Sequence, residues 1–435
     1  MTHLRSLRNI NTKRFSTTQI RSFANEPPKV EYDDKQVKVN WESGRTSSFH
    51  NIWLRDHCRS PHSFHSITKQ RLVNTSLIPS NIKPINIEST PSGLSIKWND
   101  GTEQPSSYPW KWLYQSSYNP KLVDDTQLRK NEKVLWDSRI ANNPPTIPYE
   151  FVMNDDKGVL NWLSKIVSTF WYLINLLTNT PTKEKYGIGF VDGVTPTAEA
   201  TEELTSRIAF IRETHYGKFW DFTADLKHGD TAYTDIALGA HTDTTYFTDP
   251  IGLQLFHLLQ PATSGGGESL FVDGFYCAQQ LKEKDINAFN TLVNTPIPAH
   301  SVGSPEAIML PSQRSGYPII NLDNLTQDLL QIRYNNDDRS VMTNLQPEMI
   351  EEFYRSLKLW SEIITDSANE YWTPLSAGRV VLFDNWRVLH GRASFKGKRR
   401  LCGAYINHDD YASRLLTLKE KFLDENLRNT HGTLF

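Results

Sequence analysis

Short stretches of alternating apolar and polar residues characterise the first part of the chain. Apolar side chains recur at every second position over residues 37–41 and 94–98, and the second stretch follows a turn formed by residues 91–93. Because successive side chains of a strand point to opposite faces, this pattern indicates half-buried β-strands. A further strand is expected over residues 49–54. Together these strands predict a small N-terminal β domain over residues 30–125.

The remainder of the chain combines strands with a few helices. The Asn119-Pro120 pair and the Asn-Asn-Pro-Pro stretch at 142–145 interrupt regular structure, so a second domain is expected over residues 146–435. The glycines at 265–267 predict a hairpin between the two strands that flank them. Apolar spacing predicts helices over residues 199–213 and 347–364, and strands over residues 253–259, 269–272, 379–383 and 401–406. This mainly β composition with flanking helices favours a β-barrel or jelly roll over a doubly wound sheet.

Residues 1–25 differ in composition from the rest of the chain. They contain five basic residues and seven serine or threonine residues, but no aspartate or glutamate. Leu4, Leu7 and Ile10 have the spacing of an apolar helix face. This composition is typical of a mitochondrial transit peptide, which directs the mature protein to the mitochondrion, with the matrix as the expected compartment. A disordered tail is the alternative interpretation.

The net charge and the cysteine content limit which kinds of partner and which cellular compartment are expected. The formal net charge of the chain is -2, which does not favour a nucleic-acid partner. Cys58, Cys277 and Cys402 are too widely spaced for a disulfide framework, so a reducing compartment is expected. The uncharged stretch 166–177 is shorter than the about 20 residues that span a bilayer, so we expect a buried helix and no membrane span. The oligomeric state stays open, with a homodimer as one option.

Two histidines and one aspartate have the spacing of a metal site. His241 and Asp243 lie two residues apart in HTDTTYF, and His390 follows much later in FDNWRVLHGR. Two histidines and a carboxylate on one face of the metal are the ligand set of non-haem iron(II) oxygenases. His-x-Asp triplets also begin at His228 and His408, but chance alone yields about one in a chain of this composition. No later strand follows His408 to complete a site.

Arg399 and five longer motifs extend this interpretation. Arg399 begins a predicted strand after His390, and a guanidinium group can bind a dicarboxylate there with two hydrogen bonds. The stretches HTDTTYF, VDGFY, IRYNN, FDNWRVLHGR and RRLCGAY resemble the γ-butyrobetaine dioxygenase/trimethyllysine dioxygenase family of 2-oxoglutarate oxygenases over about residues 45–415. The resemblance implies a double-stranded β-helix and a requirement for iron(II), 2-oxoglutarate, O₂ and L-ascorbate. It also implies His241, Asp243 and His390 as iron ligands and Arg399 as the anchor of the cosubstrate.

The resemblance also implies a site for a quaternary ammonium group. Such a group has no conventional hydrogen-bond donor, so aromatic faces must recognise it. Four aromatic residues match the cage of the family: Tyr216, Trp220, Tyr233 and Tyr405. At the other end of the substrate, the amides of Asn335 and Asn336 can bind a carboxylate, and Asp230 can bind an α-ammonium group. Asp230 favours trimethyllysine over γ-butyrobetaine, which lacks that amine, although a turn cap is its alternative role.

The sequence therefore predicts 3-hydroxylation of N6,N6,N6-trimethyl-L-lysine, the first step of carnitine biosynthesis. Hydroxylation of γ-butyrobetaine to carnitine and a non-catalytic module that binds quaternary ammonium compounds are the alternatives. Relatives that act on γ-butyrobetaine hold a zinc ion through three cysteines and a histidine in their N-terminal domain. Here Cys58 is accompanied by Ser60 and Ser63, with His62 and His65 nearby, which is a weak basis for a tetrahedral zinc site.

Overall fold

The computed structural model describes residues 27–123, 133–166, 185–223, 234–301 and 309–423. The expected transit peptide and most of the uncharged stretch 166–177 lie outside these residues. The described residues divide into two compact units, residues 27–123 and residues 133–423. Each unit is described by itself.

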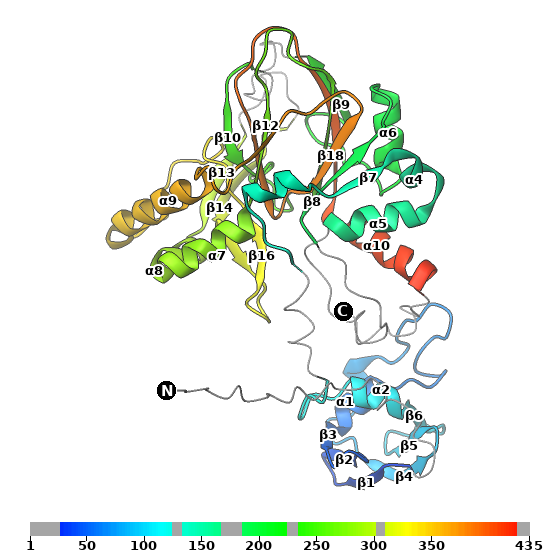
Figure 1. Cartoon of the computed structure of the whole chain (residues 1–435). Coiled ribbons are helices and arrows are strands. Elements are labelled where there is room, and N and C mark those ends of the chain that lie inside the picture. Colours follow the sequence, from blue (N-terminus) through cyan, green and yellow to red (C-terminus); the bar gives the residue numbers. More distant parts are fainter. Residues whose placement is uncertain (1–26, 124–132, 167–184, 224–233, 302–308, 424–435) are drawn as a thin grey trace, which may run out of the picture. The chain divides into compact units, whose positions relative to one another are not determined.

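The first unit consists of two antiparallel sheets of three strands, shown in blue and cyan in Figure 1. Apolar side chains of both sheets, such as Val37, Val39, Ile96 and Trp98, are buried in one core. The alternation along residues 37–41 and 94–98 thus places one face of each strand inward. The first sheet contains β1 (Lys29–Tyr32), β2 (Gln36–Asn40) and β3 (Thr46–His50), and the second contains β4 (Pro84–Thr90), β5 (Gly93–Trp98) and β6 (Ser106–Pro109). Between and after them lie α1 (Asn51–Asp56), the 3₁₀ turn η2 (Thr75–Leu77) and α2 (Trp110–Gln115).

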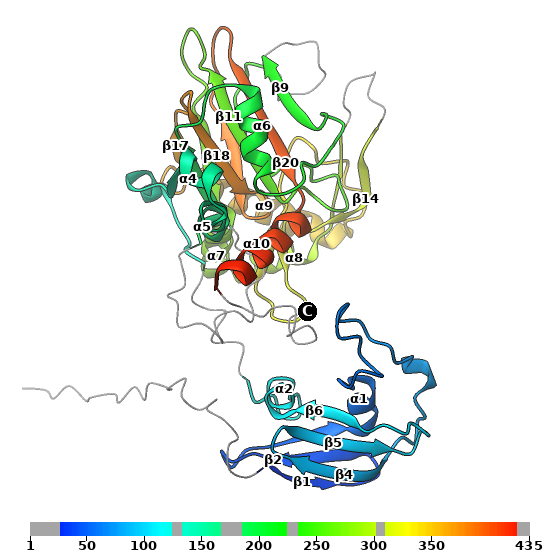
Figure 2. The same cartoon turned by 90° about the vertical axis from the view of Figure 1, so that its right-hand side faces the viewer.

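The second unit contains two larger sheets, which hold the strands expected near its C-terminal end (Figure 2). All neighbouring strands in them are antiparallel except β7 and β8. The larger sheet has the strand order β7 (Thr146–Pro148), β8 (Ile188–Asp192), β18 (Arg379–Asp384), β11 (Leu253–Gln260), β20 (Arg400–Ile406) and β9 (Phe219–Thr223). The smaller sheet has the order β10 (Leu238–His241), β19 (Val388–Arg392), β12 (Ser269–Asp273) and β17 (Tyr371–Thr373).

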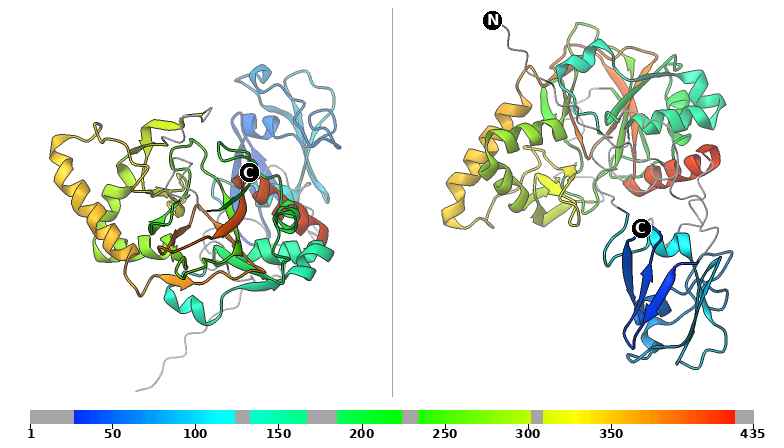
Figure 3. Two further views of the ribbon diagram at one scale, coloured as in Figure 1. Left: turned by 90° about the horizontal axis from the view of Figure 1, so that it is seen from above. Right: turned by 60° about the horizontal axis from the view of Figure 1, so that its bottom comes forward.

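Helices flank the strands of the second unit on opposite sides (Figures 1 and 3). The larger sheet packs through Leu253, Leu382 and their neighbours against α4 (Tyr149–Asn154), α5 (Asp156–Ile166), α6 (Ala198–Ser206) and α10 (His408–Leu423). The smaller sheet packs through Leu270 and Leu389 against α7 (Gly274–Lys284), α8 (Ile286–Asn294) and α9 (Ile350–Ile364). The remaining elements are η3 (Ser138–Asn142), β13 (Ile297–His300), β14 (Ser312–Tyr317), β15 (Ile320–Leu322), β16 (Leu329–Ile332) and η6 (Pro347–Met349).

A third core fills the space between the inner faces of the two sheets. Phe190 and Phe383 from the larger sheet meet Phe271 and Val388 from the smaller one there. Along β18, Val381 and Phe383 face this inner core, while Leu382 faces the helices on the other side. Burial on both faces explains why the sequence of β18 is a continuous apolar run rather than an alternating one.

Two local predictions are wrong, and a third is only partly right, because the helix expected over residues 199–213 ends at Ser206. Residues 49–54 are not one strand, because β3 ends at His50 and α1 begins at Asn51. The hairpin expected around residues 265–267 does not form either, since β11 and β12 belong to different sheets. The three glycines have positive φ angles and turn the chain along residues 394–396, with backbone hydrogen bonds to both ends of that stretch. Apolar periodicity locates strands but carries no information about which strands pair.

The contribution of a buried β18 side chain to the stability of the protein can be tested. We expect Leu382→Ala to lower the free energy of unfolding by about 2–5 kcal/mol, because the side chain is 0% exposed and its removal leaves a cavity. Leu325→Ala is the matched control, since that side chain is 85% exposed and should change stability by less than about 0.5 kcal/mol. Urea denaturation of both variants measures the difference, and equal midpoints would contradict the burial of Leu382 between β18 and the helices.

Candidate metal centre and binding cavity

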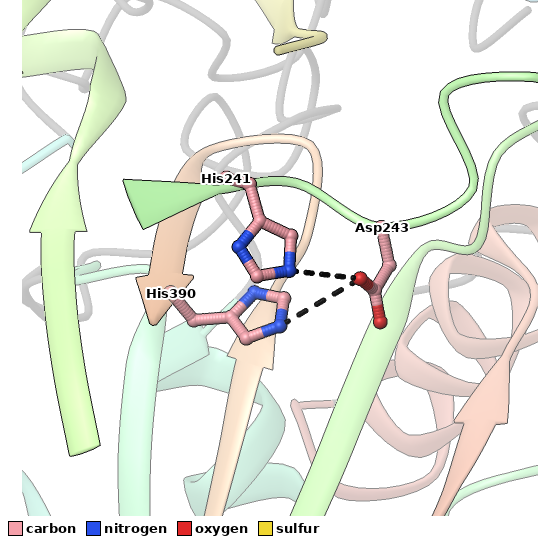
Figure 4. A group of neighbouring side chains, drawn as sticks. All are labelled: His241, Asp243 and His390. Atoms are coloured by element: carbon pink, nitrogen blue, oxygen red, sulfur yellow. Dashed lines mark ion pairs between the residues drawn. The ribbon is translucent and has the colours of Figure 1, made fainter. Parts of the chain in front are cut away.

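The three predicted metal ligands converge at the edge of the smaller sheet (Figure 4). His241 ends β10 and lies directly opposite His390 of β19, with ring centroids 4.3 Å apart. Asp243 follows two residues after β10. Its Oδ1 atom lies 3.3 Å from Nε2 of His241 and 3.7 Å from Nε2 of His390. One ligand atom from each of the three residues lies within 4.8 Å of the others.

Hydrogen bonds orient two of these side chains toward a common point. Nδ1 of His241 lies 2.8 Å from the carbonyl oxygen of Gly239 and donates to it, which leaves Nε2 as the nitrogen with a free lone pair. Oδ2 of Asp243 accepts hydrogen bonds from Nε2 of Gln254 at 2.7 Å and from the hydroxyl of Tyr405 at 3.0 Å. The carboxylate therefore offers Oδ1 to the space between the imidazoles.

The electrostatics of Asp243 and His390 suit a cation, whereas the Asp243 carboxylate outweighs burial and raises the pKa of His241 in the absence of a metal ion. Burial favours the neutral form of Asp243, but the adjacent imidazoles of His390 and His241 outweigh it, so the pKa of Asp243 lies well below its ordinary value. Burial, reinforced by the nearby His241, lowers the pKa of His390 to about 3. A carboxylate and a neutral imidazole are the forms that ligate metals. Two imidazoles and one monodentate carboxylate fit a non-haem ferrous ion with open coordination positions.

The IRYNN motif holds the loop that carries Asp243. The backbone N–H of Thr242 donates to the carbonyl of Tyr334 at 2.7 Å, and the N–H of Tyr334 donates to Oγ1 of Thr242 at 3.0 Å. The guanidinium group of Arg333 donates to the carbonyl of Thr245 at 2.7 and 3.0 Å and also to that of Phe247. Hydrogen bonds thus tie together two motifs that are about 90 residues apart in the sequence, beside the metal centre.

A cavity of about 650 Å³ surrounds the metal cluster. Arg399, which directly precedes β20, lines it together with Arg392 and Ser269. Arg399 is only 5% exposed, and its burial, together with the charge of Arg392, lowers the pKa of its guanidinium group to about 10. The Nε atom of Arg399 is buried and has no hydrogen-bond partner among the described residues. A buried cation of this kind fits a carboxylate of a bound molecule.

Aromatic side chains form another wall of the same cavity. Trp220 of β9 and Tyr405 of β20 line it with ring centroids 5.8 Å apart, and Tyr216 lines it too. Sequence reasoning missed Tyr246, whose hydroxyl lies 3.3 Å from that of Tyr216, and Phe256, whose ring lies 5.6 Å from that of Trp220. Tyr246 lies inside the HTDTTYF motif and Phe256 in an apolar strand, so only the three-dimensional contacts assign them to this wall.

The polar residues expected at the substrate end are only partly described. Asn335 and Asn336 both line the cavity, and Nδ2 of Asn335 donates to Oδ2 of Asp338 at 2.9 Å. Asp230 and Tyr233 lie outside the described residues. No sequence pattern marked Asp337 and Lys358, which line the same cavity and are exposed at its outer part.

The other candidate ligands do not form a comparable group. His408 stacks on Trp386 with ring centroids 4.1 Å apart. Oγ of Ser60 donates to the carbonyl of Pro105 at 3.1 Å, and Oγ of Ser63 accepts from Arg55 at 3.3 Å. Across the described ranges, His241, Asp243 and His390 are the single group of three possible metal ligands, and no helix is long and apolar enough to cross a membrane.

The hydrogen bond from Tyr405 to Asp243 can be tested separately from the aromatic ring. We expect Tyr405→Phe to weaken Mn²⁺ binding about tenfold, because the carboxylate loses a partner that fixes its orientation. Electron paramagnetic resonance of free Mn²⁺ in a titration of metal-free protein measures this. Tyr371→Phe is the control, since Tyr371 is equally buried on β17 but does not line the cavity. Unchanged affinity in the Tyr405 variant would show that the hydroxyl does not support the ligand.

Family models and curated proteins match most of this chain. Residues 182–405 match the family model described as "Taurine catabolism dioxygenase TauD, TfdA family", and residues 29–114 match "Gamma-butyrobetaine hydroxylase-like, N-terminal". Trimethyllysine dioxygenase of Meyerozyma guilliermondii is 40% identical over 89% of this chain and 94% of its own length. The mitochondrial trimethyllysine dioxygenase of Homo sapiens is 36% identical over 85% of this chain and 83% of its own.

Two more distant similarities are weaker. Gamma-butyrobetaine dioxygenase of a Pseudomonas species is 28% identical over 88% of this chain and 94% of its own length. A putative taurine dioxygenase structure from Burkholderia xenovorans aligns with a TM-score of 0.40 and 14% identity, over 52% of this chain and 82% of that one. From the family model and the identities of its relatives, the chain belongs to the TauD/TfdA family of dioxygenases and, within it, to the trimethyllysine dioxygenases.

Proposed function

We propose that the chain is an iron(II)- and 2-oxoglutarate-dependent dioxygenase that hydroxylates C3 of N6,N6,N6-trimethyl-L-lysine, the first step of carnitine biosynthesis. The observation that carries this proposal is the presence of three features in one cavity: the His241, Asp243 and His390 cluster, the buried Arg399 and an aromatic wall. Membership of the trimethyllysine dioxygenases supports the choice of substrate.

The residues around the metal centre fit both expected cofactors. His241, Asp243 and His390 would hold the ferrous ion, and Arg399 would bind the distal carboxylate of 2-oxoglutarate. When bound, iron and 2-oxoglutarate activate O₂ so that one oxygen atom enters a substrate C–H bond while 2-oxoglutarate is converted to succinate and CO₂. L-Ascorbate, which would keep the iron reduced, is part of the proposal. The protein supplies the ligand geometry and a cavity lined by charged and aromatic side chains.

The aromatic wall would position the substrate. The trimethylammonium group is a permanent cation, and each aromatic face contributes about 0.5–2 kcal/mol to its binding. Trp220, Tyr216 and Tyr405 supply such faces, and Tyr233 is proposed as the fourth. Because Tyr405 also donates to Asp243, the wall and the metal centre share one residue. That connection would hold one substrate C–H bond at a constant distance from the metal, which is the positioning contribution to catalysis.

The opposite end of the substrate carries an ammonium and a carboxylate group. We propose that the amides of Asn335 and Asn336 bind the carboxylate and that Asp230 binds the α-ammonium group. The γ-butyrobetaine alternative lacks this amine, and the relative named for that activity is 28% identical, compared with 40% for a trimethyllysine dioxygenase. A module that only binds quaternary ammonium compounds would have no need for the metal cluster.

The finer architecture and location are also proposals. We infer that the two sheets of the second unit form a double-stranded β-helix, within an oxygenase domain over residues 146–435, and that residues 30–125 are a separate β domain. The opposed inner faces of the two sheets support this inference. The mammalian relatives are named mitochondrial, which supports a transit peptide over residues 1–25 and a location in the matrix.

The choice between the two substrates gives the most direct test of the function. With iron(II), 2-oxoglutarate and ascorbate, we expect trimethyllysine to release succinate with a kcat/KM at least tenfold above that for γ-butyrobetaine. His241→Ala, which removes a metal ligand, is the control and should release none above background. Equal turnover of both substrates, or none with trimethyllysine, would argue against the assigned reaction.

The aromatic wall makes a second prediction. We expect Trp220→Leu to raise KM for trimethyllysine at least tenfold, because a buried face for the trimethylammonium group is lost while an apolar side chain remains. Trp372→Leu is the control, since Trp372 is 43% exposed on β17 and does not line the cavity. Steady-state kinetics distinguish the two variants, and an unchanged KM for the Trp220 variant would remove this residue from the substrate site.

A further inference from the structure

We propose that Asn385 is a positioning residue whose side-chain amide clamps the backbone of Asp243, and that this clamp sets the distance between the two remote segments that carry the metal ligands. The proposal rests on the metal site of the proposed function. It assigns a role to a residue of the FDNWRVLHGR motif that neither ligates the metal nor lines the cavity.

The contacts of Asn385 use both ends of its amide. Its Oδ1 atom accepts a hydrogen bond from the backbone N–H of Asp243 at 2.8 Å. Its Nδ2 atom donates to the carbonyl of Asp243 at 3.1 Å and to that of Ile251 at 3.2 Å. The side chain is 1% exposed, so water is not available as a substitute partner. A primary amide is the group that can accept from one backbone N–H and donate to two carbonyls at the same time.

Asn385 is itself held firmly in the turn between β18 and β19. Its backbone N–H donates to the carbonyl of Gly252 at 2.9 Å. Nearby in the same turn, Arg387 forms a fully buried ion pair with Asp273, with donor–acceptor distances of 2.7 and 3.0 Å. The backbone N–H of Ile332 donates to the carbonyl of Trp386 at 2.8 Å. The turn is therefore a fixed reference point, and the clamp ties the loop of Asp243 to it.

The loop needs such an anchor because strand pairing ends before it. The pairing of β10 with β19 stops at the His241 and His390 pair, and Asp243 lies beyond it. The next residue, Thr244, has a φ angle of 58°, which is unfavourable for a β-branched side chain and persists only when neighbouring contacts enforce it. One such contact is the hydrogen bond from the N–H of Ile251 to Oγ1 of Thr244 at 3.0 Å. Asn385 thus binds Asp243, which directly precedes this strained position, and Ile251, whose N–H holds the Thr244 side chain.

The clamp also connects the loop with the third ligand. His390 lies on β19, the strand that the turn of Asn385 leads into. Asn385 and His390 are thus parts of one hairpin, whereas His241 and Asp243 come from a stretch more than 130 residues earlier. The backbone pairing of His241 with His390 fixes the two imidazoles, and the amide of Asn385 fixes the carboxylate relative to them. Without the amide, the backbone of Asp243 loses two hydrogen bonds, while the strand pairing that holds both imidazoles stays in place.

The affinity for a metal ion tests this role without recourse to turnover. In a Mn²⁺ titration of the metal-free full chain, we expect Asn385→Ala to bind at least tenfold more weakly than the wild type, in the range found when groups that orient metal ligands are removed. Metal-free proteins are compared by circular dichroism and thermal melting in the same buffer. These measurements separate a change in the site from a loss of folding.

Asn369→Ala provides a matched control. Asn369 is 3% exposed, and its side chain makes three hydrogen bonds, to the carbonyl of Ile363 and to both amide atoms of Gln280. We expect Asn369→Ala to lower the melting temperature about as much as Asn385→Ala does. Because Asn369 lies outside the metal cluster and its loop, we expect its variant to retain the wild-type Mn²⁺ affinity within about twofold.

Asn385→Asp addresses the case in which the alanine variant does not fold. The aspartate has nearly the same shape and still accepts from the N–H of Asp243, but it faces two carbonyls without a donor, so Mn²⁺ affinity should again fall at least tenfold. Wild-type affinity in the folded aspartate or alanine variant, or an equal loss in the Asn369 variant, would overturn the proposal. A wild-type chain that binds no Mn²⁺ would instead refute the metal site itself, so the two failures are distinguishable.

Discussion

The convergence of two imidazoles and one carboxylate at the end of a strand pair is the constraint on which this structure depends. Direct pairing of His241 with His390 brings together residues from distant parts of the chain, and the loop after β10 must then return Asp243 to the same point. Burying these polar groups costs free energy unless a cation neutralises the carboxylate and receives the nitrogen lone pairs. The two-sheet architecture, the fixed turn before β19 and the IRYNN contacts all serve to hold this arrangement.

The cavity around the metal centre offers a buried cation to an anionic ligand and aromatic ring faces to a cationic one. Arg399 is a buried cation whose Nε–H has no partner in the part of the chain that the structure describes, which suits a carboxylate that accepts directed hydrogen bonds. The aromatic wall around Trp220 offers negative ring faces, which suit a cation that has no N–H to donate. Tyr405 belongs to both regions, because its ring lies beside Trp220 and its hydroxyl holds Asp243. Groups suited to an anionic cosubstrate and groups suited to a quaternary ammonium substrate therefore line one cavity.

Much of this arrangement could be predicted from the sequence, and the failures have physical causes. The strands near the C-terminal end were located within a residue or two because burial on one or both faces leaves a clear apolar pattern. The hairpin around residues 265–267 was wrong because periodicity does not reveal which strands pair. Local motifs marked His241, Asp243 and His390, but residues such as Gln254 and Asn385 act through contacts made only in the fold.

The number of ferrous ions bound per chain tests the central claim most directly. Anaerobic equilibrium dialysis of the metal-free protein against Fe²⁺ should give one tightly bound ion for the wild type. Under the same conditions, Asp243→Ala should bind none above background while retaining the circular dichroism spectrum of the folded chain. A variant that keeps its full equivalent of iron, or a wild type that binds none, would contradict an iron site built from His241, Asp243 and His390.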